Sequence, residues 1–286
     1  MSALPALKNP IEPVTEQEYW EQYYNDSETN YEWNNACLEE KLVSDFITYL
    51  VYRWFQSILN QYLTVNPIAE FTGLEMGFRL QLANKVTIRK PDLGVVLNNN
   101  PVALSPTDRT YNGVFDMCVE ALSDSSEAEI RRDTIVKKAE YASVGIKEYY
   151  ILYGLNYQME FYRLHRGLYV PVERVDGDVV QSGVLPGFQF RVGDLHSRPS
   201  FESMMDDPVY QGFILPDYRR EKIARGQAEE KALKAEQQTV IEAQRAREAE
   251  RLAKTETQRA EKAEQRVQNV EAELARLKAL LAERGK

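Results

Sequence analysis

The last quarter of the chain has a composition that permits little other than a helix. After Tyr218 there is no aromatic residue and no proline, and no glycine occurs between Gly226 and Gly285. Alanine, glutamate, lysine, arginine and glutamine fill most of this stretch, and these residues have high helix propensities. We therefore expect residues 219–286 to form one long helix.

An apolar seam follows the C-terminal part of this predicted helix. Its members alternate at spacings of three and four residues, which is typical of a coiled coil; they are Val267, Val270, Leu274, Leu277 and Leu281. Upstream, apolar residues recur every 11 positions, which indicates a straight or slightly right-handed supercoil. We expect a homo-oligomer, most simply a dimer, held through residues 240–283. A single solvated helix is the alternative.

Charge is unevenly distributed along the chain. The whole chain has a net charge of −9, yet residues 219–286 hold 17 basic and 13 acidic residues, so residues 1–218 hold 18 basic and 31 acidic ones. No basic residue occurs between Lys8 and Lys41. A protein that binds nucleic acid mainly by neutralising phosphates is expected to be basic. The composition therefore argues against tight non-specific DNA binding by residues 1–218.

Cysteine and histidine are scarce, which limits the possible classes of protein. The chain has two cysteines and two histidines, which excludes a disulfide-rich scaffold or a four-cysteine zinc module. The most apolar stretch, residues 46–52, is far shorter than the roughly 20 residues that a membrane-spanning helix needs. No signal peptide is visible at the N-terminus. We expect a cytoplasmic protein without a membrane segment.

The order of predicted elements indicates a mixed α/β (α+β) domain built around one sheet. Residues 1–35 are acidic and aromatic-rich and are expected to lie on the surface as an extension. Apolar residues at helical spacing predict a helix over residues 36–62, and the period-two alternation from Leu74 to Leu82 predicts a strand. The further predicted elements are strands at 86–97 and 114–122, a helix at 127–144 that ends at Gly145, a strand at 148–153, and a hairpin of 158–164 with 168–174.

Two carboxylates occupy positions where charge is unfavourable. Asp92 follows Pro91 inside an otherwise apolar strand, and Glu120 lies near the end of the apolar strand 114–122. A buried charge costs several kcal/mol unless it is paired or binds a cation. A shared Mg²⁺ site would explain both residues, since Mg²⁺ prefers carboxylate oxygens and water. The alternative is that Asp92 is a turn residue and Glu120 pairs with an arginine.

Three sequence motifs together resemble a known family. They are the Pro91-Asp92 pair, the strand end Val119-Glu120-Ala121-Leu122-Ser123, and the series Lys137, Tyr141, Gly145, Ile146, Glu148, Tyr149 and Tyr150. In this order and spacing, residues 36–195 resemble the Uma-type family, described as putative restriction endonucleases, of the PD-(D/E)XK nuclease superfamily. The resemblance implies a restriction-endonuclease-like core with a mixed sheet flanked by helices, over residues 36–200.

The same resemblance implies the residues of a metal-dependent active site. Asp92, Glu120 and the backbone carbonyl of Ala121 would hold Mg²⁺ or Mn²⁺. The usual lysine of the superfamily lies two residues after the second acid, where this chain has Leu122, so the resemblance places it at Lys137. Lys137 would orient the attacking water and stabilise charge in the transition state.

The residues leave two questions about this site open. A surface ion pair with Asp133 is the alternative for Lys137. The superfamily often adds a glutamate from the first helix, for which the candidates are Glu39 and Glu40.

These observations predict a metal-dependent endonuclease acting on DNA, with a linker at residues 201–218 before the C-terminal helix. Two rival functions remain. One is a catalytically idle nuclease-fold protein that assembles through its coiled coil. The other is a hydrolase of a small phosphoester, which would not need a basic DNA groove.

Overall fold

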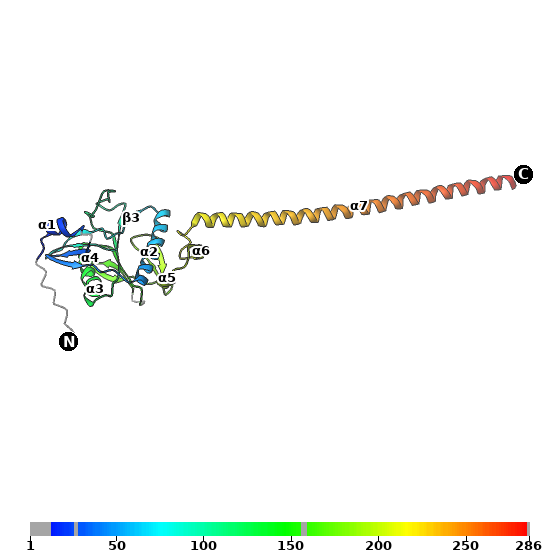
Figure 1. Cartoon of the computed structure of the whole chain (residues 1–286). Coiled ribbons are helices and arrows are strands. Elements are labelled where there is room, and N and C mark those ends of the chain that lie inside the picture. Colours follow the sequence, from blue (N-terminus) through cyan, green and yellow to red (C-terminus); the bar gives the residue numbers. More distant parts are fainter. Residues whose placement is uncertain (1–12, 26–27, 156–158, 285–286) are drawn as a thin grey trace. The chain divides into compact units, whose positions relative to one another are not determined.

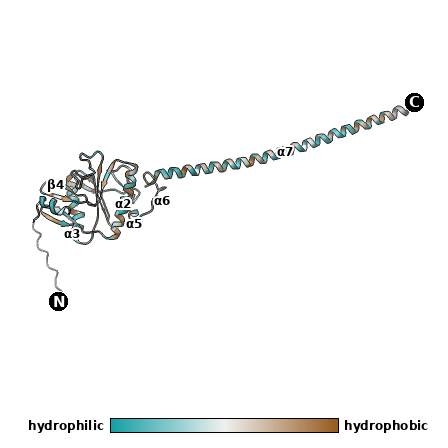
Figure 2. Cartoon of the chain, turned by 45° about the horizontal axis from the view of Figure 1, so that its top comes forward, coloured by the Kyte–Doolittle hydropathy of each residue, from teal (hydrophilic) through white to brown (hydrophobic). Residues whose placement is uncertain are grey.

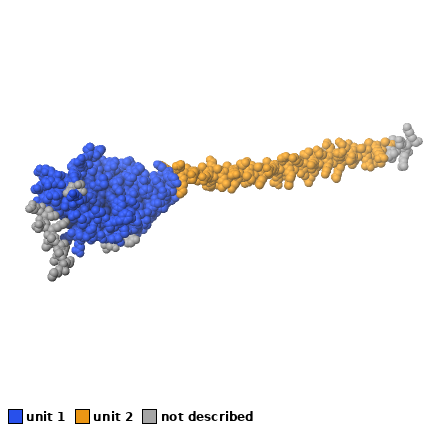
Figure 3. Space-filling model, in the orientation of Figure 1, with its two compact units in different colours: residues 1–219 blue, residues 220–286 orange. Residues whose placement is uncertain are grey.

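The computed structural model describes residues 13–25, 28–155 and 159–284, with side chains up to residue 279. The chain divides into two compact units, residues 1–219 and 220–286 (Figures 1 and 3). A single helix, α7 (Pro216–Arg284), forms the described part of the second unit. The predicted long C-terminal helix is therefore confirmed. Hydrophobic positions recur among hydrophilic ones along α7 (Figure 2).

A six-stranded mixed sheet forms the centre of the first unit. Its strand order is β10-β9-β8-β7-β6-β3, and only β7 and β8 run parallel. A parallel pair needs a crossover connection, which the helical segment 127–144 supplies here. The bounds are β3 (Ala69–Thr72), β6 (Leu93–Leu97), β7 (Met117–Ala121), β8 (Glu148–Leu152), β9 (Glu160–His165) and β10 (Leu168–Pro171).

Helices cover both faces of this sheet. Adjacent residues of a strand point to opposite faces, and on β8 the ring of Tyr149 contacts Tyr141 whereas the ring of Tyr150 contacts Phe55. The helical segment 127–144 therefore covers one face, and α2 (Phe46–Val65) covers the other. The segment consists of α3 (Glu127–Arg131), a π-helical turn η2 (Arg132–Lys137) and α4 (Lys138–Val144). This mixed α+β architecture confirms the predicted fold class.

A second sheet contains four antiparallel strands in the order β2-β1-β5-β4. Its bounds are β1 (Tyr31–Asn34), β2 (Cys37–Glu40), β4 (Phe78–Gln81) and β5 (Val86–Arg89). The predicted helix over residues 36–62 is wrong in its first ten residues. Asn35 and Ala36 both have positive φ, which makes a two-residue hairpin turn whose twist matches that of the strands. The helix begins only at Phe46, after the N-cap Asp45.

The described N-terminal residues pack into the first unit and do not form a surface extension. Tyr19, in the π-helical turn η1 (Tyr19–Tyr23) that follows α1 (Glu16–Glu18), is fully buried. Trp33 and Glu32 of β1 are also buried. The prediction of a surface extension is therefore wrong for residues 13–25 and 28–35, and residues 1–12 lie outside the described part of the chain.

The predicted strand over residues 86–97 is divided between the two sheets. β5 pairs with β1 and β4, whereas β6 pairs with β3 and β7. The chain crosses from one sheet to the other at Lys90-Pro91-Asp92, because proline has no N–H to continue a ladder. The predicted strand over 74–82 is likewise shorter, since Leu74 and Glu75 have positive φ and the side chain of Leu74 is fully exposed.

Elements after the central strands complete the core. The predicted hairpin around Arg166-Gly167 is present as β9 and β10. It is followed by β11 (Val179–Gln181), β12 (Gln189–Arg191), α5 (Val192–Ser197) and α6 (Phe201–Met204). The segment predicted as a linker, residues 201–218, instead packs on α2, where Tyr210 contacts Trp54 and Phe213 contacts Tyr62. No helix within the described ranges is long and apolar enough to cross a membrane.

Candidate active site

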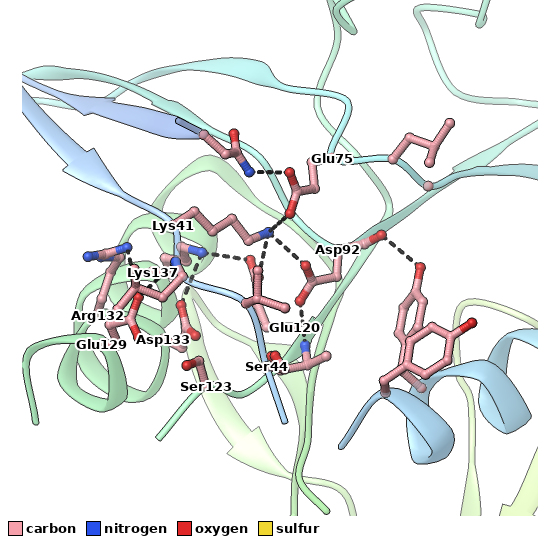
Figure 4. A pocket seen from close by; sticks show the side chains of 18 of the residues that line it. Lys41, Ser44, Glu75, Asp92, Glu120, Ser123, Glu129, Arg132, Asp133 and Lys137 are labelled. Carbon is pink, nitrogen blue, oxygen red and sulfur yellow. Dashed lines mark hydrogen bonds and ion pairs between the residues drawn. The ribbon is translucent and has the colours of Figure 1, made fainter. Parts of the chain in front are cut away.

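The two carboxylates singled out from the sequence converge on one point. Asp92 lies at the crossing between the sheets and Glu120 is on β7, on the face covered by the helical segment 127–144. The ammonium nitrogen of Lys41 lies 2.7 Å from Asp92 Oδ1 and 3.8 Å from Glu120 Oε2 (Figure 4). Both carboxylates therefore face the same ammonium, Asp92 from the crossing between the sheets and Glu120 from β7.

Ala121 joins the two carboxylates through its backbone. Its N–H donates to Asp92 Oδ2 at 2.6 Å, which fixes the orientation of that carboxylate. Its carbonyl oxygen accepts a hydrogen bond from Ser44 Oγ at 2.7 Å. A carbonyl oxygen has two lone pairs, so it can accept from Ser44 and bind a second partner as well.

Lys137 binds Glu120 and is almost completely buried. Only 1% of its side chain is exposed, and its ammonium nitrogen lies 3.1 Å from Glu120, 3.1 Å from Glu32 and 3.0 Å from Asp133. The alternative, an ion pair with Asp133 on the helix surface, is therefore only partly right. The pair with Asp133 is present, but it is buried, and the same ammonium also binds two other carboxylates. An ammonium has three N–H donors, so these three carboxylates can occupy all of them.

Sequence analysis missed Glu32, which binds Lys137, and Arg89, which binds Glu32. Glu32 is fully buried and accepts hydrogen bonds from Arg89 at 3.1 Å and from the Lys90 N–H at 2.9 Å. Arg89 is also fully buried and bonds to Glu140 at 2.6 Å. The nearest available signal was a glutamate between two aromatic residues, Tyr31 and Trp33, on one short strand.

Neither candidate for the additional glutamate reaches the two carboxylates. Glu39 binds Arg89 at 2.5 Å, and the backbone carbonyl of Glu40 accepts from Arg132 at 2.8 Å. Both residues belong to β2 and not to a helix. Among the described residues, Glu75 is the carboxylate that approaches instead, at 3.6 Å from the Lys41 ammonium.

Burial strongly shifts the ionisation of these groups. Burial raises the pKa of Glu120 to about 8, although the nearby Lys137 and Lys41 act in the opposite direction. Burial also acts to raise the pKa of Glu32, but there Lys137 and Arg89 prevail and the pKa falls below its usual range. The pKa of Lys137 is raised, because its carboxylates outweigh the burial that would lower it. Displaced carboxyl pKa values of this kind are common at functional sites.

An open cavity of about 770 Å³ gives access to this cluster. Its charged lining contains three basic and five acidic side chains, which leaves two excess negative charges if all are ionised; they are Lys41, Arg132, Lys137, Glu75, Asp92, Glu120, Glu129 and Asp133. Its apolar lining includes Leu42, Val43, Tyr49 and Leu74, all of which are exposed. A phosphodiester anion would be repelled by the charged floor unless a further cation were bound there.

The donor set fits a hard divalent cation held by few protein ligands. Within the described ranges, no three histidine, cysteine, aspartate or glutamate residues form a metal-binding group. However, Mg²⁺ keeps several waters and is commonly held by only one or two carboxylates. Asp92, Glu120 and the Ala121 carbonyl offer oxygen atoms alone, and acidic side chains outnumber basic ones in the lining of the cavity.

Comparison with known proteins identifies the family of this chain. The family model Uma2, described as "Putative restriction endonuclease", matches residues 17–193. The chain belongs to the Uma2 family. The matched range contains Asp92, Glu120 and Lys137, together with the cavity that joins them. No curated protein matches the chain.

A solved structure shares the fold of the Uma2 domain. It is described as a "putative nuclease belonging to DUF820" from Anabaena variabilis ATCC 29413. The two chains are 15% identical, the TM-score is 0.52, and the match covers 65% of this chain and 98% of the other. At this identity the likeness establishes the fold, and it agrees with the predicted restriction-endonuclease-like core.

Proposed function

We propose that this protein is a nuclease that hydrolyses DNA phosphodiester bonds with Mg²⁺ or Mn²⁺ held by Asp92, Glu120 and the Ala121 carbonyl. The observation that carries the proposal is the convergence of two carboxylates, from separate segments of the chain, on one cation position at the floor of an open cavity. When bound, the divalent ion would offset charge on the phosphodiester and lower the pKa of water.

The protein's own residues have distinct tasks in this proposal. The Ala121 N–H holds Asp92 in one orientation. The Tyr141 hydroxyl donates to Glu120 at 3.0 Å, and Lys137 binds the same Oε1 atom at 3.1 Å. Tyr141 and Lys137 therefore hold one carboxylate oxygen of Glu120, and the other oxygen faces Lys41. Three carboxylates surround the Lys137 ammonium and occupy its donors. In place of the expected role of orienting the attacking water, we therefore assign Lys137 to the active site as the residue that positions and stabilises Glu120.

The lining of the cavity favours a nucleic acid over a small phosphoester. Exposed apolar and aromatic side chains such as Val43, Tyr49 and Leu74 line the cavity whose floor holds the charged cluster. Nucleobases stack on aromatic side chains and contact apolar ones, whereas a small phosphate ester leaves such surfaces exposed. The excess of acidic residues outside the cavity argues for binding by local contacts and not by a broad basic groove.

We also propose that the chain forms a homodimer through residues 240–283. Apolar side chains along α7 are exposed in the single chain; among the described ones are Ile241, Leu252, Val267, Val270, Leu274 and Leu277. Burying such a seam in a coiled coil removes apolar surface from water. Two active sites related by a two-fold axis would match the opposite polarity of the two strands of a duplex. The prediction for Leu281 lies outside the described side chains.

We propose the cytoplasm as the location of the protein, in keeping with two free cysteines, Cys37 and Cys118.

A nicking assay tests the proposed activity. Purified protein is incubated with supercoiled plasmid and with a single-stranded oligonucleotide in Mg²⁺ or Mn²⁺, and we expect nicked or shortened DNA. Lys137→Ala should lose at least about 100-fold in rate, in the range of removing an electrostatic group of a site. Lys138→Ala is the matched control, because the Lys138 ammonium lies 3.6 Å over the ring of Tyr162, away from the cluster.

Three outcomes would count against the proposal. Equal losses from Lys137→Ala and Lys138→Ala would show that Lys137 has no special part in the reaction. Absence of cleavage over a broad panel of DNA substrates and metals would favour the idle interaction protein. Cleavage of small phosphate esters alone would favour the rival function of a small-phosphoester hydrolase.

A further inference from the structure

A second lysine, Lys41, lies at the centre of the active site. It directly follows β2 and was not singled out from the sequence. Its ammonium nitrogen lies 2.7 Å from Asp92, 3.8 Å from Glu120 and 3.6 Å from Glu75, and it donates to the Lys90 carbonyl at 2.6 Å. Figure 4 shows this nitrogen joined by dashed lines to Asp92, Glu120 and Glu75.

The two lysines of the cluster differ in how firmly they are held. Lys137 has three carboxylates within 3.1 Å and is 1% exposed. Lys41 has one carboxylate within 3.1 Å and two at longer distances, and 11% of its side chain is exposed to the cavity. Its chain neighbours Leu42 and Val43 are exposed. Lys41 is therefore the lysine that can leave its partners and still remain inside the cavity.

Charge makes Lys41 and a divalent ion competitors for one place. In the free protein the ammonium neutralises Asp92 and lies beside Glu120. A divalent ion between the same oxygen atoms would repel the ammonium at this distance. The lysine stem has several rotatable bonds and its ammonium is a compact donor that suits phosphate oxygens.

We propose that Lys41 is a functional residue of this site: its ammonium is the counter-ion of Asp92 in the free protein, a divalent ion replaces it, and the released ammonium contacts the substrate phosphate. Lys41 thus acts on the substrate directly, whereas Lys137 acts through Glu120. This inference rests on the proposed metal-dependent nuclease function. It adds to that function a residue that lowers metal affinity in the free protein and raises substrate affinity in the loaded one.

The first test is a calorimetric titration of the full-length protein with Mn²⁺ at pH 7.5, in the absence of DNA. We expect Lys41→Gln to bind Mn²⁺ at least tenfold more tightly than wild type, because the competing positive charge is gone. Lys41→Arg keeps the charge and should bind Mn²⁺ as wild type does. Lys138→Gln is the matched control for loss of a lysine charge elsewhere on the same unit. Melting curves verify that each variant is folded.

The second test measures binding of an oligonucleotide in Ca²⁺, which occupies oxygen-ligand sites, with cleavage checked on the same samples. Lys41→Gln should bind the oligonucleotide at least tenfold more weakly than wild type, although it binds Mn²⁺ more tightly. A merely structural role for Lys41 would weaken both. This opposite shift of two affinities is the signature of the proposal.

The outcomes separate this inference from the proposed function. If Asp92→Asn abolishes Mn²⁺ binding but Lys41→Gln leaves it unchanged or weaker, Lys41 is not the displaced counter-ion and the metal site stands. If Lys41→Gln binds Mn²⁺ more tightly but binds the oligonucleotide as wild type does, the phosphate contact is wrong. If neither wild type nor Lys41→Gln binds Mn²⁺, the metal-dependent function and the inference both fail.

Discussion

Replacing Glu120 by glutamine should stabilise the metal-free protein and abolish its response to metal. Burial raises the pKa of Glu120 to about 8, from an ordinary value of 4.5. Between these two pH values the unfolded chain has released this proton and the folded protein still holds it. Stability therefore falls as the pH rises from about 4.5 to about 8, and the loss is complete above pH 8. A glutamine resembles the protonated carboxyl and avoids this loss.

The size of the effect follows from the linkage between ionisation and folding. With these pKa values, the carboxyl lowers the free energy of unfolding by about 1 kcal/mol or less at pH 5 and by roughly 3 kcal/mol at pH 7. For a unit of this size, each kcal/mol corresponds to about 2–4 °C in melting temperature. Glu120→Gln should therefore melt close to wild type at pH 5 and several degrees above it at pH 7. The hydrogen bond from Tyr141 survives, since the amide oxygen accepts it.

Thermal melts of both proteins from pH 5 to pH 8 measure this difference, first in EDTA and then in Mn²⁺. Mn²⁺ should raise the melting temperature of wild type by mass action and leave Glu120→Gln unchanged. A stability difference that stays constant with pH would refute the reasoning, because it would mean that Lys137 and Lys41 keep Glu120 ionised in the folded protein. An equal rise of both proteins in Mn²⁺ would exclude Glu120 as a ligand.

Three further changes test the fold and the assembly. Arg89→Met removes the cation shared by two buried carboxylates, Glu32 and Glu140, and should lower the free energy of unfolding by about 3–5 kcal/mol in urea unfolding. Arg79→Met removes an exposed pair and should cost about 1 kcal/mol or less in the same assay. Gly94→Ala places a methyl group 2.5 Å from a buried aromatic ring and should lower the free energy of unfolding by about 1–3 kcal/mol in the same assay. Gly212→Ala is the control, because its methyl group meets no atom within 4 Å and should leave the free energy of unfolding nearly unchanged. A chain ended after Tyr218 should have a lower mass in light scattering than the full chain without a lower melting temperature; an unchanged stoichiometry, or a monomeric full-length protein, would refute the coiled-coil dimer.

Local sequence signals determined the helices whose ends are marked by capping residues. The helical segment 127–144 has a serine N-cap at Ser126 and ends at Gly145 in the left-handed conformation, so its limits are set by residues within it. The tail is helical because of its composition alone. Motif order and spacing identified Asp92, Glu120 and Lys137, and the fold brings these three residues into one connected cluster.

Only the tertiary structure decided which charged residues are buried and what surrounds them. Glu32, Lys41 and Glu75 are distant from Asp92 and Glu120 along the chain, and they carry no local pattern that marks a site. They meet because the chain crosses between two sheets at Pro91 and because the hairpin of β1 and β2 lies beside that crossing. A period of hydrophobic residues reports which face of an element is apolar. It does not indicate which distant carboxylate neutralises a buried ammonium. The distance between two such groups is set by the pairing of strands that are remote in the chain.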